Sequence, residues 1–529
     1  MNPFCLMLLL LPVIIAGCVP SQPQTYSSVA TDVEPANLIV EGLYAGPVMM
    51  KFANGELRYL QVGDGNGRNV EIVRRVYFAL RDERFDTPMP KFDKITLVRN
   101  ADSFTAEMSA RVSSKDVDYV WTGKIEGKSD GTITYTVSGT AMRDFNSPRI
   151  GLNVLLPTSS CGGRPLELTM LNGMKKKETF PKLPTSWDTG RFKSLMYQPA
   201  LPGGETAPTA VISLSGREFG IEDQRQFGDS SYKMYGYVDY PFPKIAKDAK
   251  ASQTLTIKIM DPASVRQAAA QPDTISVTLG KGMIKEVIPQ IKLSHEAGKS
   301  ADFNSAANPK NKDAKVLTWG FNTCMHLYDP DTLFENASTV IDQVAAVRAN
   351  APHARIMIDP ITFQWPYEGA RPDGRVGTNL GAAWSVEMVK QLALAGADEG
   401  VFRLANAEWE TSPAGDALRK LAQMSGKALL ESTVDVPGRA PVSVLAVRDN
   451  PSVRTVFLVN RVNQRLKVLL PKVAQAQAVV GPIQLGNDSW MAGKDVYTCS
   501  DGGIEAKGPD VEIVIGPYAV LAFTVAEGE

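Results

Sequence analysis

The sequence predicts a multidomain chain of mixed α/β and β class, with a large N-terminal antiparallel β-sandwich, a central βα domain and a small C-terminal β-sandwich. Two changes in periodicity predict this order. Over residues 38–270, apolar and polar residues alternate between turn signals, which is typical of antiparallel sheet with one solvated face. Over 271–435, short β-like runs alternate with helical ones, as in parallel βα units. Over 436–529 the β pattern returns.

The chain begins with an apolar run over residues 4–18, about as long as a signal-peptide core, that ends in small residues before a cysteine. A membrane-spanning helix is the alternative, but the run is shorter than the roughly 20 residues that a span requires. Ile15-Ala16-Gly17-Cys18 resembles a bacterial lipobox. The resemblance implies that residues 1–17 are removed, that Cys18 carries a lipid, and that the protein is held in the bacterial envelope, at the outer membrane facing the periplasm. Residues 18–37, rich in Pro, Ser, Gln and Thr, are expected to be a flexible tether.

The composition argues against several classes of function. A net charge of −1 with 44% hydrophobic residues indicates a globular protein without the basic field that nucleic-acid binding needs. Apart from Cys5 and Cys18, the cysteines are Cys161, Cys324 and Cys499, too far apart to predict a disulfide framework or a zinc site. The sequence has no Gly-x-Ser-x-Gly elbow, zinc-protease His pair or dinucleotide loop, so we expect neither a metal nor another cofactor. It does not predict an oligomeric state.

Local signals define individual elements. In the first domain, Asp130-Gly131 predicts the tight turn of a β-hairpin, followed by an alternating strand over 133–137. In the βα domain, Asp329 is the expected N-cap of one helix that continues to about residue 350, because Pro and a stripe of apolar residues follow it. A second helix is expected to end at Gly396.

A polar stretch interrupts the first domain. Residues 222–235 read EDQRQFGDSSYKMY, with seven charged or amide side chains and three aromatic ones, between two β-like runs. A hairpin tip needs only a few turn residues, so this length and polarity predict a long loop that contacts a polar ligand. Its candidate site residues are Glu222, Asp223, Arg225, Asp229 and Lys233.

Several stretches carry a resemblance to a known family. They include IVRRVYFALRDERF over 72–85, GKIEGKSDGTITYTVSGTAMRDFNSPRIGLNVLLP over 123–157, GREFGIEDQRQFGDSSYKMY over 216–235 and GAAWSVEMVKQLALAGAD over 381–398. In these stretches the chain is similar to the D-apionate lactonase family. The resemblance implies a β domain, a TIM-like barrel and a C-terminal β-sandwich, and an activity that hydrolyses a branched sugar-acid lactone.

The predicted barrel is truncated. A closed (β/α)₈ barrel takes about 250 residues, whereas about 160 lie in 271–435. We therefore expect an incomplete TIM-like domain of about four strands that packs against the first β domain. Because exposed strand edges pair with other chains, its open side should be covered by residues 299–313 or by the β domain. Leu404 stands where the resemblance implies a glutamate, with Glu408 and Glu410 nearby.

Opening a lactone requires a base or an activated water at the carbonyl carbon, and a donor for the developing oxyanion. We predict Glu222, Asp223 and His326 as catalytic residues, because carboxylates and a titratable ring can supply these roles. The predicted substrate-binding residues are Arg225, Asp229, Lys233, Asp359 and Glu408. His326 follows a parallel strand, where such domains keep their sites, so we expect these groups to approach one another across the domain junction and line one cleft.

Other interpretations stay open on sequence alone. The polar stretch could be a salt-bridged cover that pins two domains together, and His326 could be a satisfied interior side chain. Trp384 is expected in the core because it sits on a helical face, whereas Trp365 and Trp409 could stack on sugars. The predicted function is hydrolysis of a sugar-acid lactone or related carbohydrate. The alternative is a non-catalytic glycan-binding or structural envelope lipoprotein.

Overall fold

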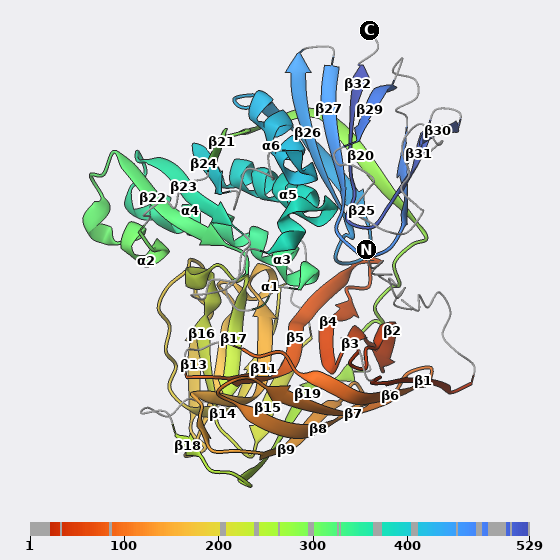
Figure 1. Cartoon of the computed structure of the whole chain (residues 1–529), viewed down its shortest axis with the longest axis vertical. Coiled ribbons are helices and arrows are strands. Elements are labelled where there is room, and N and C mark those ends of the chain that lie inside the picture. The colour runs from red at the N-terminus through yellow and green to blue at the C-terminus, as the bar shows by residue number, and fades with distance from the viewer. Residues whose placement is uncertain are drawn as a thin grey trace, which may run out of the picture. The chain divides into compact units, whose positions relative to one another are not determined.

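The computed structural model describes residues 22–31, 34–83, 87–200, 208–236, 243–262, 265–294, 301–324, 327, 329–362, 373–403, 411–450, 453–471, 479–484, 504–507 and 510–526. The described chain divides into two compact units, coloured along the sequence in Figure 1. The N-terminal unit runs to residue 224 and includes 231–270, and the C-terminal unit comprises 225–230 and 271 onward. Within the described ranges, no helix is long and apolar enough to cross a membrane.

The N-terminal unit is almost entirely antiparallel β. Its strands are β1 (Gln24–Val29), β2 (Ile39–Ala45), β3 (Val48–Ala53), β4 (Glu56–Gly63), β5 (Asn69–Arg81), β6 (Lys91–Arg99), β7 (Phe104–Ser113), β8 (Asp118–Gly127), β9 (Ile133–Ala141), β10 (Phe145–Asn146), β11 (Arg149–Pro157), β12 (Pro165–Met170), β13 (Lys175–Thr179), β14 (Phe192–Tyr197), β15 (Ala210–Ser215), β16 (Phe219–Asp223), β17 (Ser231–Gly236), β18 (Lys244–Ile245) and β19 (Lys250–Ile259). One turn of helix, α1 (Thr158–Cys161), follows β11. All these strands except β10 and β18 belong to one 17-stranded sheet.

The pairings fold this sheet over one hydrophobic core (Figure 1). One series of pairs runs β1, β6, β7, β8, β9, β19, β15 and β14, and the other runs β2, β3, β4, β5, β11, β17 and β16. Trp121 and Tyr135 from the first series and Phe52 and Leu152 from the second are buried in the same cluster. The predicted antiparallel β character of this region is therefore confirmed.

The predicted hairpin at Asp130-Gly131 is confirmed. Gly131 has a φ of 80°, a left-handed conformation that glycine adopts without steric cost. The backbone N–H of Thr132 donates to Asp130 Oδ1 over 2.9 Å, which stabilises the turn. Beyond it, β9 buries Ile133 and Tyr135 at alternate positions, as the period-two pattern predicts.

The C-terminal unit combines a parallel sheet, helices and a second sheet that is antiparallel except for the parallel pair β20–β28. The parallel sheet has the order β21 (Gln290–Ser294), β24 (Glu399–Arg403), β23 (Arg355–Thr362) and β22 (Val316–Asn322). Its helices are α2 (Phe303–Ala306), α3 (Pro330–Ala337), α4 (Thr339–Asn350), α5 (Asn379–Ala395) and α6 (Pro413–Gln423), with 3-10 turns η3 (Pro309–Asn311) and η4 (Gly374–Gly377). The other sheet has the order β29 (Val479–Gln484), β32 (Val520–Ala526), β27 (Val453–Asn460), β26 (Val442–Asn450), β25 (Ala428–Asp435), β20 (Thr274–Val287), β28 (Leu466–Leu470), β31 (Asp510–Ile515) and β30 (Ile504–Lys507).

The helix starts follow the predicted caps, but the first long helix is broken. Asp329 caps α3 by accepting the backbone N–H of Thr332 over 3.1 Å. The predicted single helix is wrong, because Ser338 separates α3 from α4 and its hydroxyl donates back to the carbonyl of Glu335. The predicted end of α5 is confirmed, since Gly396 adopts the left-handed C-cap conformation with a φ of 70°.

One edge of the parallel sheet is covered as predicted. Ala301 forms an isolated parallel bridge with Trp319 of β22, and the ring of Phe303 from α2 meets the Trp319 ring edge-on at 6.1 Å. Residues 301–306 therefore shield the exposed edge of β22 from pairing with another chain.

Among the described residues, the two faces of the parallel sheet differ in character. Ile356 and Ile358 of β23 are buried against the helices, whereas Arg355 and Asp359 point to the other face. That face carries an ion-pair cluster in which Glu399 accepts from Lys292 and from Arg355, each over 2.6 Å. A closed barrel would fill this inner face with packed side chains.

Candidate functional site

The polar stretch 222–235 is mostly strand. Residues up to 223 belong to β16, residues from 231 belong to β17, and the 3-10 turn η1 (Gln224–Phe227) begins the connection between them. The prediction of one long loop is therefore wrong. These residues are polar although they form strands, because they line a polar side of the sheet. The usual sequence signal of a strand, alternation of apolar and polar residues, is therefore missing here.

Four neighbouring strands bring polar side chains together on one side of the sheet. Antiparallel register places Arg81 of β5 opposite Arg149 of β11, and Glu222 of β16 opposite Lys233 of β17. Cross-strand partners share one side of a sheet, as do alternate residues along a strand. We call this set the polar face; it comprises Arg75, Tyr77, Arg81, Arg149, Asn153, Glu222, Lys233 and Tyr235.

Arg149 is the most constrained cation of the polar face. Its guanidinium lies over the ring of Tyr235 at 3.8 Å, and Nη1 lies 3.6 Å from Oε1 of Glu222. Only 7% of Arg149 is exposed, and its Nε and Nη1 atoms are buried without a hydrogen-bond partner. Burial lowers the pKa of Arg149, while Glu222 acts in the opposite direction and Arg81 adds to the lowering. The site therefore holds a partly desolvated positive charge.

Glu222 differs from its neighbours in exposure. Its side chain is 25% exposed, whereas Lys233 is 2% exposed and Asp223 is fully buried. Asp223 Oδ2 accepts the backbone N–H of Thr185 over 3.4 Å. Glu222 is thus the carboxylate of this hairpin that a solvent molecule can reach, and it lies beside a cation with unused donors.

The tip of the hairpin belongs to the C-terminal unit. Arg225 Nη1 lies 3.2 Å from Asp342 Oδ2, and the carbonyl of Arg225 accepts from Gln343 Nε2 over 2.8 Å. Asn336 Nδ2 donates to Asp229 Oδ1 over 2.8 Å. Both predicted ligand contacts, Arg225 and Asp229, thus bind groups of α3 and α4. This arrangement favours the interpretation of the tip as a structural clasp.

The comparisons with known proteins concern the domain that carries the polar face. Residues 30–262 match the family model described as D-apionate lactonase, N-terminal domain. In this region the chain is therefore similar to the N-terminal domain of the D-apionate lactonase family. The D-apionate lactonase of Brucella anthropi is 26% identical over 259 residues, which make up 48% of this chain and 40% of the relative. The chain therefore spans less than half the length of that curated relative.

Likenesses to solved structures are weak. A bifunctional glucanase-xylanase from a metagenome library has a TM-score of 0.30 and 11% identity, covering 40% of this chain and 44% of that one. An arabinofuranosidase from Xanthomonas axonopodis pv. citri has a TM-score of 0.30 and 9% identity, covering 44% and 57%. At these scores the likenesses assign neither a substrate nor a mechanism. The polar face, by contrast, lies wholly within the matched lactonase-family domain.

The remaining predicted site residues lie in the C-terminal unit or outside the described residues. Asp359 lies within β23 of the C-terminal unit, next to the ion pairs of Glu399. His326 and Glu408 lie outside the described residues, as does the lipidation residue Cys18. The predicted meeting of Glu222 with His326 therefore stays a prediction.

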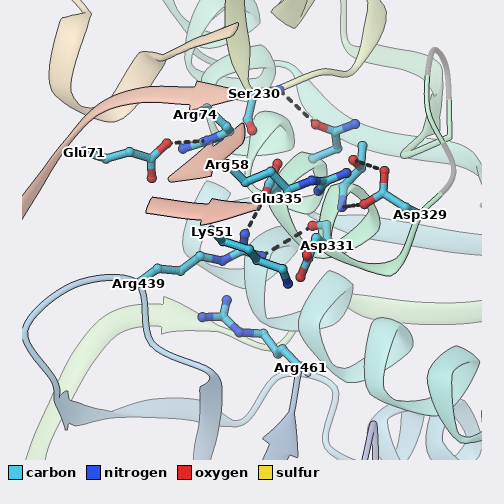
Figure 2. Close-up of polar contacts among 12 residues, drawn as sticks. Lys51, Arg58, Glu71, Arg74, Ser230, Asp329, Asp331, Glu335, Arg439 and Arg461 are labelled. Carbon is cyan, nitrogen blue, oxygen red and sulfur yellow. Dashed lines mark hydrogen bonds and ion pairs between the residues drawn. The ribbon is translucent and has the colours of Figure 1, made fainter. Parts of the chain in front are cut away.

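A second polar cluster surrounds α3. Arg439 pairs with Glu335 and donates to the carbonyl of Asp331 over 3.4 Å (Figure 2). Nearby, the backbone N–H of Ser230 donates to Asn336 Oδ1 over 3.1 Å. These contacts are between groups of the protein itself. They hold α3 to the loop before β26 and to the hairpin tip, and they leave the lactonase-family polar face as the better candidate site.

The other candidate groups have structural roles. Trp384 is 3% exposed and its Nε1 donates to Thr323 Oγ1 over 3.0 Å, which confirms the prediction of a core residue. Cys161 and Cys324 are free and buried, and burial raises the pKa of both thiols. Among the described residues, no group of three or more His, Cys, Asp or Glu side chains is placed to hold a metal ion.

Sequence reasoning missed Arg81, Arg149 and Asn153. Their signal is visible in retrospect, because each is a polar residue inside a run of strand-forming residues, in YFALRD and in SPRIGLNVLLP. A charged residue on the buried side of a strand needs a partner or a ligand, which makes such positions candidates for function.

Proposed function

We propose that this protein hydrolyses the lactone of a sugar acid or a related carbohydrate, with its site on the polar face of the N-terminal unit. The observation that carries the proposal is Glu222, partly exposed and 3.6 Å from Arg149, within a domain that matches the D-apionate lactonase family. A carboxylate next to a desolvated cation with free donors supplies both the base and the oxyanion donor that acyl transfer to water requires.

In this proposal Glu222 removes a proton from a water molecule as the water oxygen bonds to the lactone carbonyl carbon. The carbonyl oxygen becomes negative and accepts hydrogen bonds from Nε and Nη1 of Arg149, which make no hydrogen bond within the protein. When the tetrahedral intermediate collapses, the bond from carbon to the ring oxygen breaks. The ring oxygen takes the proton back from Glu222 and the open hydroxy acid ionises. His326 stays part of the proposal as a second proton carrier.

We further propose that the C-terminal unit derives from a TIM-like barrel that has lost strands. Its parallel sheet contains four strands in the described residues, and the inner side of that sheet is charged. This proposal supports the rival function, in which the protein binds a carbohydrate without turnover or has a structural role in the envelope. The matched region also covers only 40% of the curated relative.

The purified protein should be incubated with D-apionolactone and other sugar lactones while acid release and thermal stability are measured. Acid release supports the hydrolase, a thermal shift without acid release supports the binding protein, and neither response leaves the structural role. The Glu222→Gln variant should lower kcat by about 10²- to 10⁴-fold with little loss of stability, because a general base is removed. Glu126→Gln, which changes an exposed carboxylate of β8, is the control and should leave kcat unchanged.

A further inference from the structure

Two arginine pairs on adjacent strands are neutralised to different degrees. Arg58 of β4 lies opposite Arg75 of β5, and Glu56 pairs with both, at 3.1 Å and 2.5 Å. Arg81 and Arg149 are likewise cross-strand partners, but the carboxylate beside Arg149, Glu222, is 3.6 Å away and partly exposed. Like charges directly opposite each other destabilise a sheet. The second pair is therefore less completely neutralised than the first, so a further negative charge beside it would be favourable.

The unused hydrogen-bonding atoms next to this pair define what a ligand must offer. Nε and Nη1 of Arg149 make no hydrogen bond, although Nη1 lies in ion-pair range of Glu222, and only 7% of the residue is exposed. Asn153, 1% exposed, has the opposite need, because its Oδ1 is a buried acceptor without a donor. Leaving such groups unpaired costs stability, so a ligand that supplies both an acceptor and a donor here would be favoured.

We propose that Arg149, Arg81 and Asn153 form a binding site for a small hydroxy-carboxylate. A carboxylate matches the fork of a guanidinium, and a ligand hydroxyl can donate to Asn153 Oδ1. This inference rests on the proposed function for its choice of ligand, because an open sugar acid has both groups whereas its lactone has no charge. The site therefore binds the acid more tightly than the lactone, and a hydrolase built on it is inhibited by its own product.

Arg99 of β6 provides a matched comparison within the same unit. It is 2% exposed and has the same unpartnered Nε and Nη1 atoms. Its cross-strand partners are Gln24 and Phe104, so it does not face a second guanidinium across the ladder. Arg99→Met thus removes a buried arginine without touching the polar face.

The test is isothermal titration of the purified protein with D-apionate, with D-apiose as the neutral sugar of the same skeleton. We expect D-apionate to bind, with an affinity that falls as salt rises, and D-apiose not to bind. Arg149→Met should weaken D-apionate binding by at least about tenfold, since a charge-assisted pair is lost. Arg149→Lys keeps the charge without the fork and should give an intermediate affinity. Arg99→Met should bind as the unmodified protein does.

Equal binding of D-apiose and D-apionate, or unchanged affinity in Arg149→Met, would overturn the inference. If Arg149→Met does not fold, the salt dependence and the Arg149→Lys variant decide in the same way. The outcome is separable from the proposed function because binding is measured without turnover. Binding of D-apionate without lactone hydrolysis keeps the site and rejects the hydrolase. Hydrolysis without product binding or product inhibition does the reverse.

Discussion

The surroundings of Asp359 in the folded protein disfavour its ionised form. It points to the charged side of the parallel sheet, where Glu399 already takes the ion pairs of Lys292 and Arg355. Burial raises the pKa of Asp359, the charge of Glu399 raises it further, and Lys292 lowers it in part. Ionised Asp359 is therefore a cost to the folded state at neutral pH.

Asp359→Asn should raise the melting temperature at pH 7.5, because it removes a charge that folding disfavours. The folded pKa lies above the unfolded value of about 3.9, so the folded state binds the proton more tightly. The gain should shrink as the pH falls through the folded pKa, and it should vanish only below the unfolded value of about 3.9, where Asp359 is protonated in both states. Melting curves at pH 4.5 and 7.5 measure this, with exposed Asp313→Asn as the control. A lower melting temperature for Asp359→Asn at pH 7.5 would show that its carboxylate makes a favourable contact.

Glu222 could be chosen as a candidate from the sequence, but its neighbours on the polar face, Arg149 and Arg81, could not. Glu222 stands in a conspicuously polar stretch of the sequence. Arg149, in contrast, is a single charge within a β-like run, and its cross-strand partner Arg81 lies 68 positions earlier. Only the register of β5 and β11 brings them together. Register depends on the pairing of whole strands, which a single sequence specifies only through patterns too weak to align here.

At the scale of elements, the hairpin tip between β16 and β17 depends on a close backbone approach. Gly228 has a φ of 98°, and a Cβ atom on it would lie 2.8 Å from the carbonyl oxygen of Asn322 at the end of β22. Both the conformation and the space demand glycine. This approach lets Asp229 and Ser230 reach Asn336 of α3.

Gly228→Ala should therefore loosen the tip from α3 and α4. Gly67→Ala is the matched control, since Gly67 has a φ of 83° but nothing within 4 Å of the position of its Cβ. We expect both variants to lose about 1–2 kcal/mol from the left-handed conformation, and Gly228→Ala to lose about 1–3 kcal/mol more from the clash. Hydrogen exchange should rise over residues 330–350 in Gly228→Ala alone. Equal exchange in the two variants would contradict the clasp.

The helix ends were predictable where a capping residue marks them. Asp329 and Gly396 mark a start and an end that the structure keeps, because a capping oxygen and a left-handed glycine act locally. The break at Ser338 was not predictable from periodicity, since apolar residues of α3 and α4 continue one stripe in the sequence.

At the scale of the whole molecule, the order of β, βα and β segments follows from periodicity, but strand membership does not. β20 lies in the sequence before the helices, yet it pairs with β25 in antiparallel and with β28 in parallel orientation, in the nine-stranded sheet. Such pairings join residues far apart in sequence, which no local pattern records.

The position of the molecule in the cell is a separate proposal, carried by the lipobox-like Ile15-Ala16-Gly17-Cys18. We propose that Cys18 is lipidated and anchors the chain to the bacterial outer membrane. Two lipid signals on one residue give stable anchoring where a single acyl chain does not. Cys18→Ala should abolish incorporation of labelled palmitate and shift the protein from the membrane to the soluble fraction or leave it uncleaved. Cys5→Ala, which changes the other cysteine of the same apolar run, is the matched control and should keep label and location. Unchanged label and fractionation in Cys18→Ala would reject the anchor, whereas loss of both in Cys5→Ala would show that the run itself, and not the cysteine, determines them.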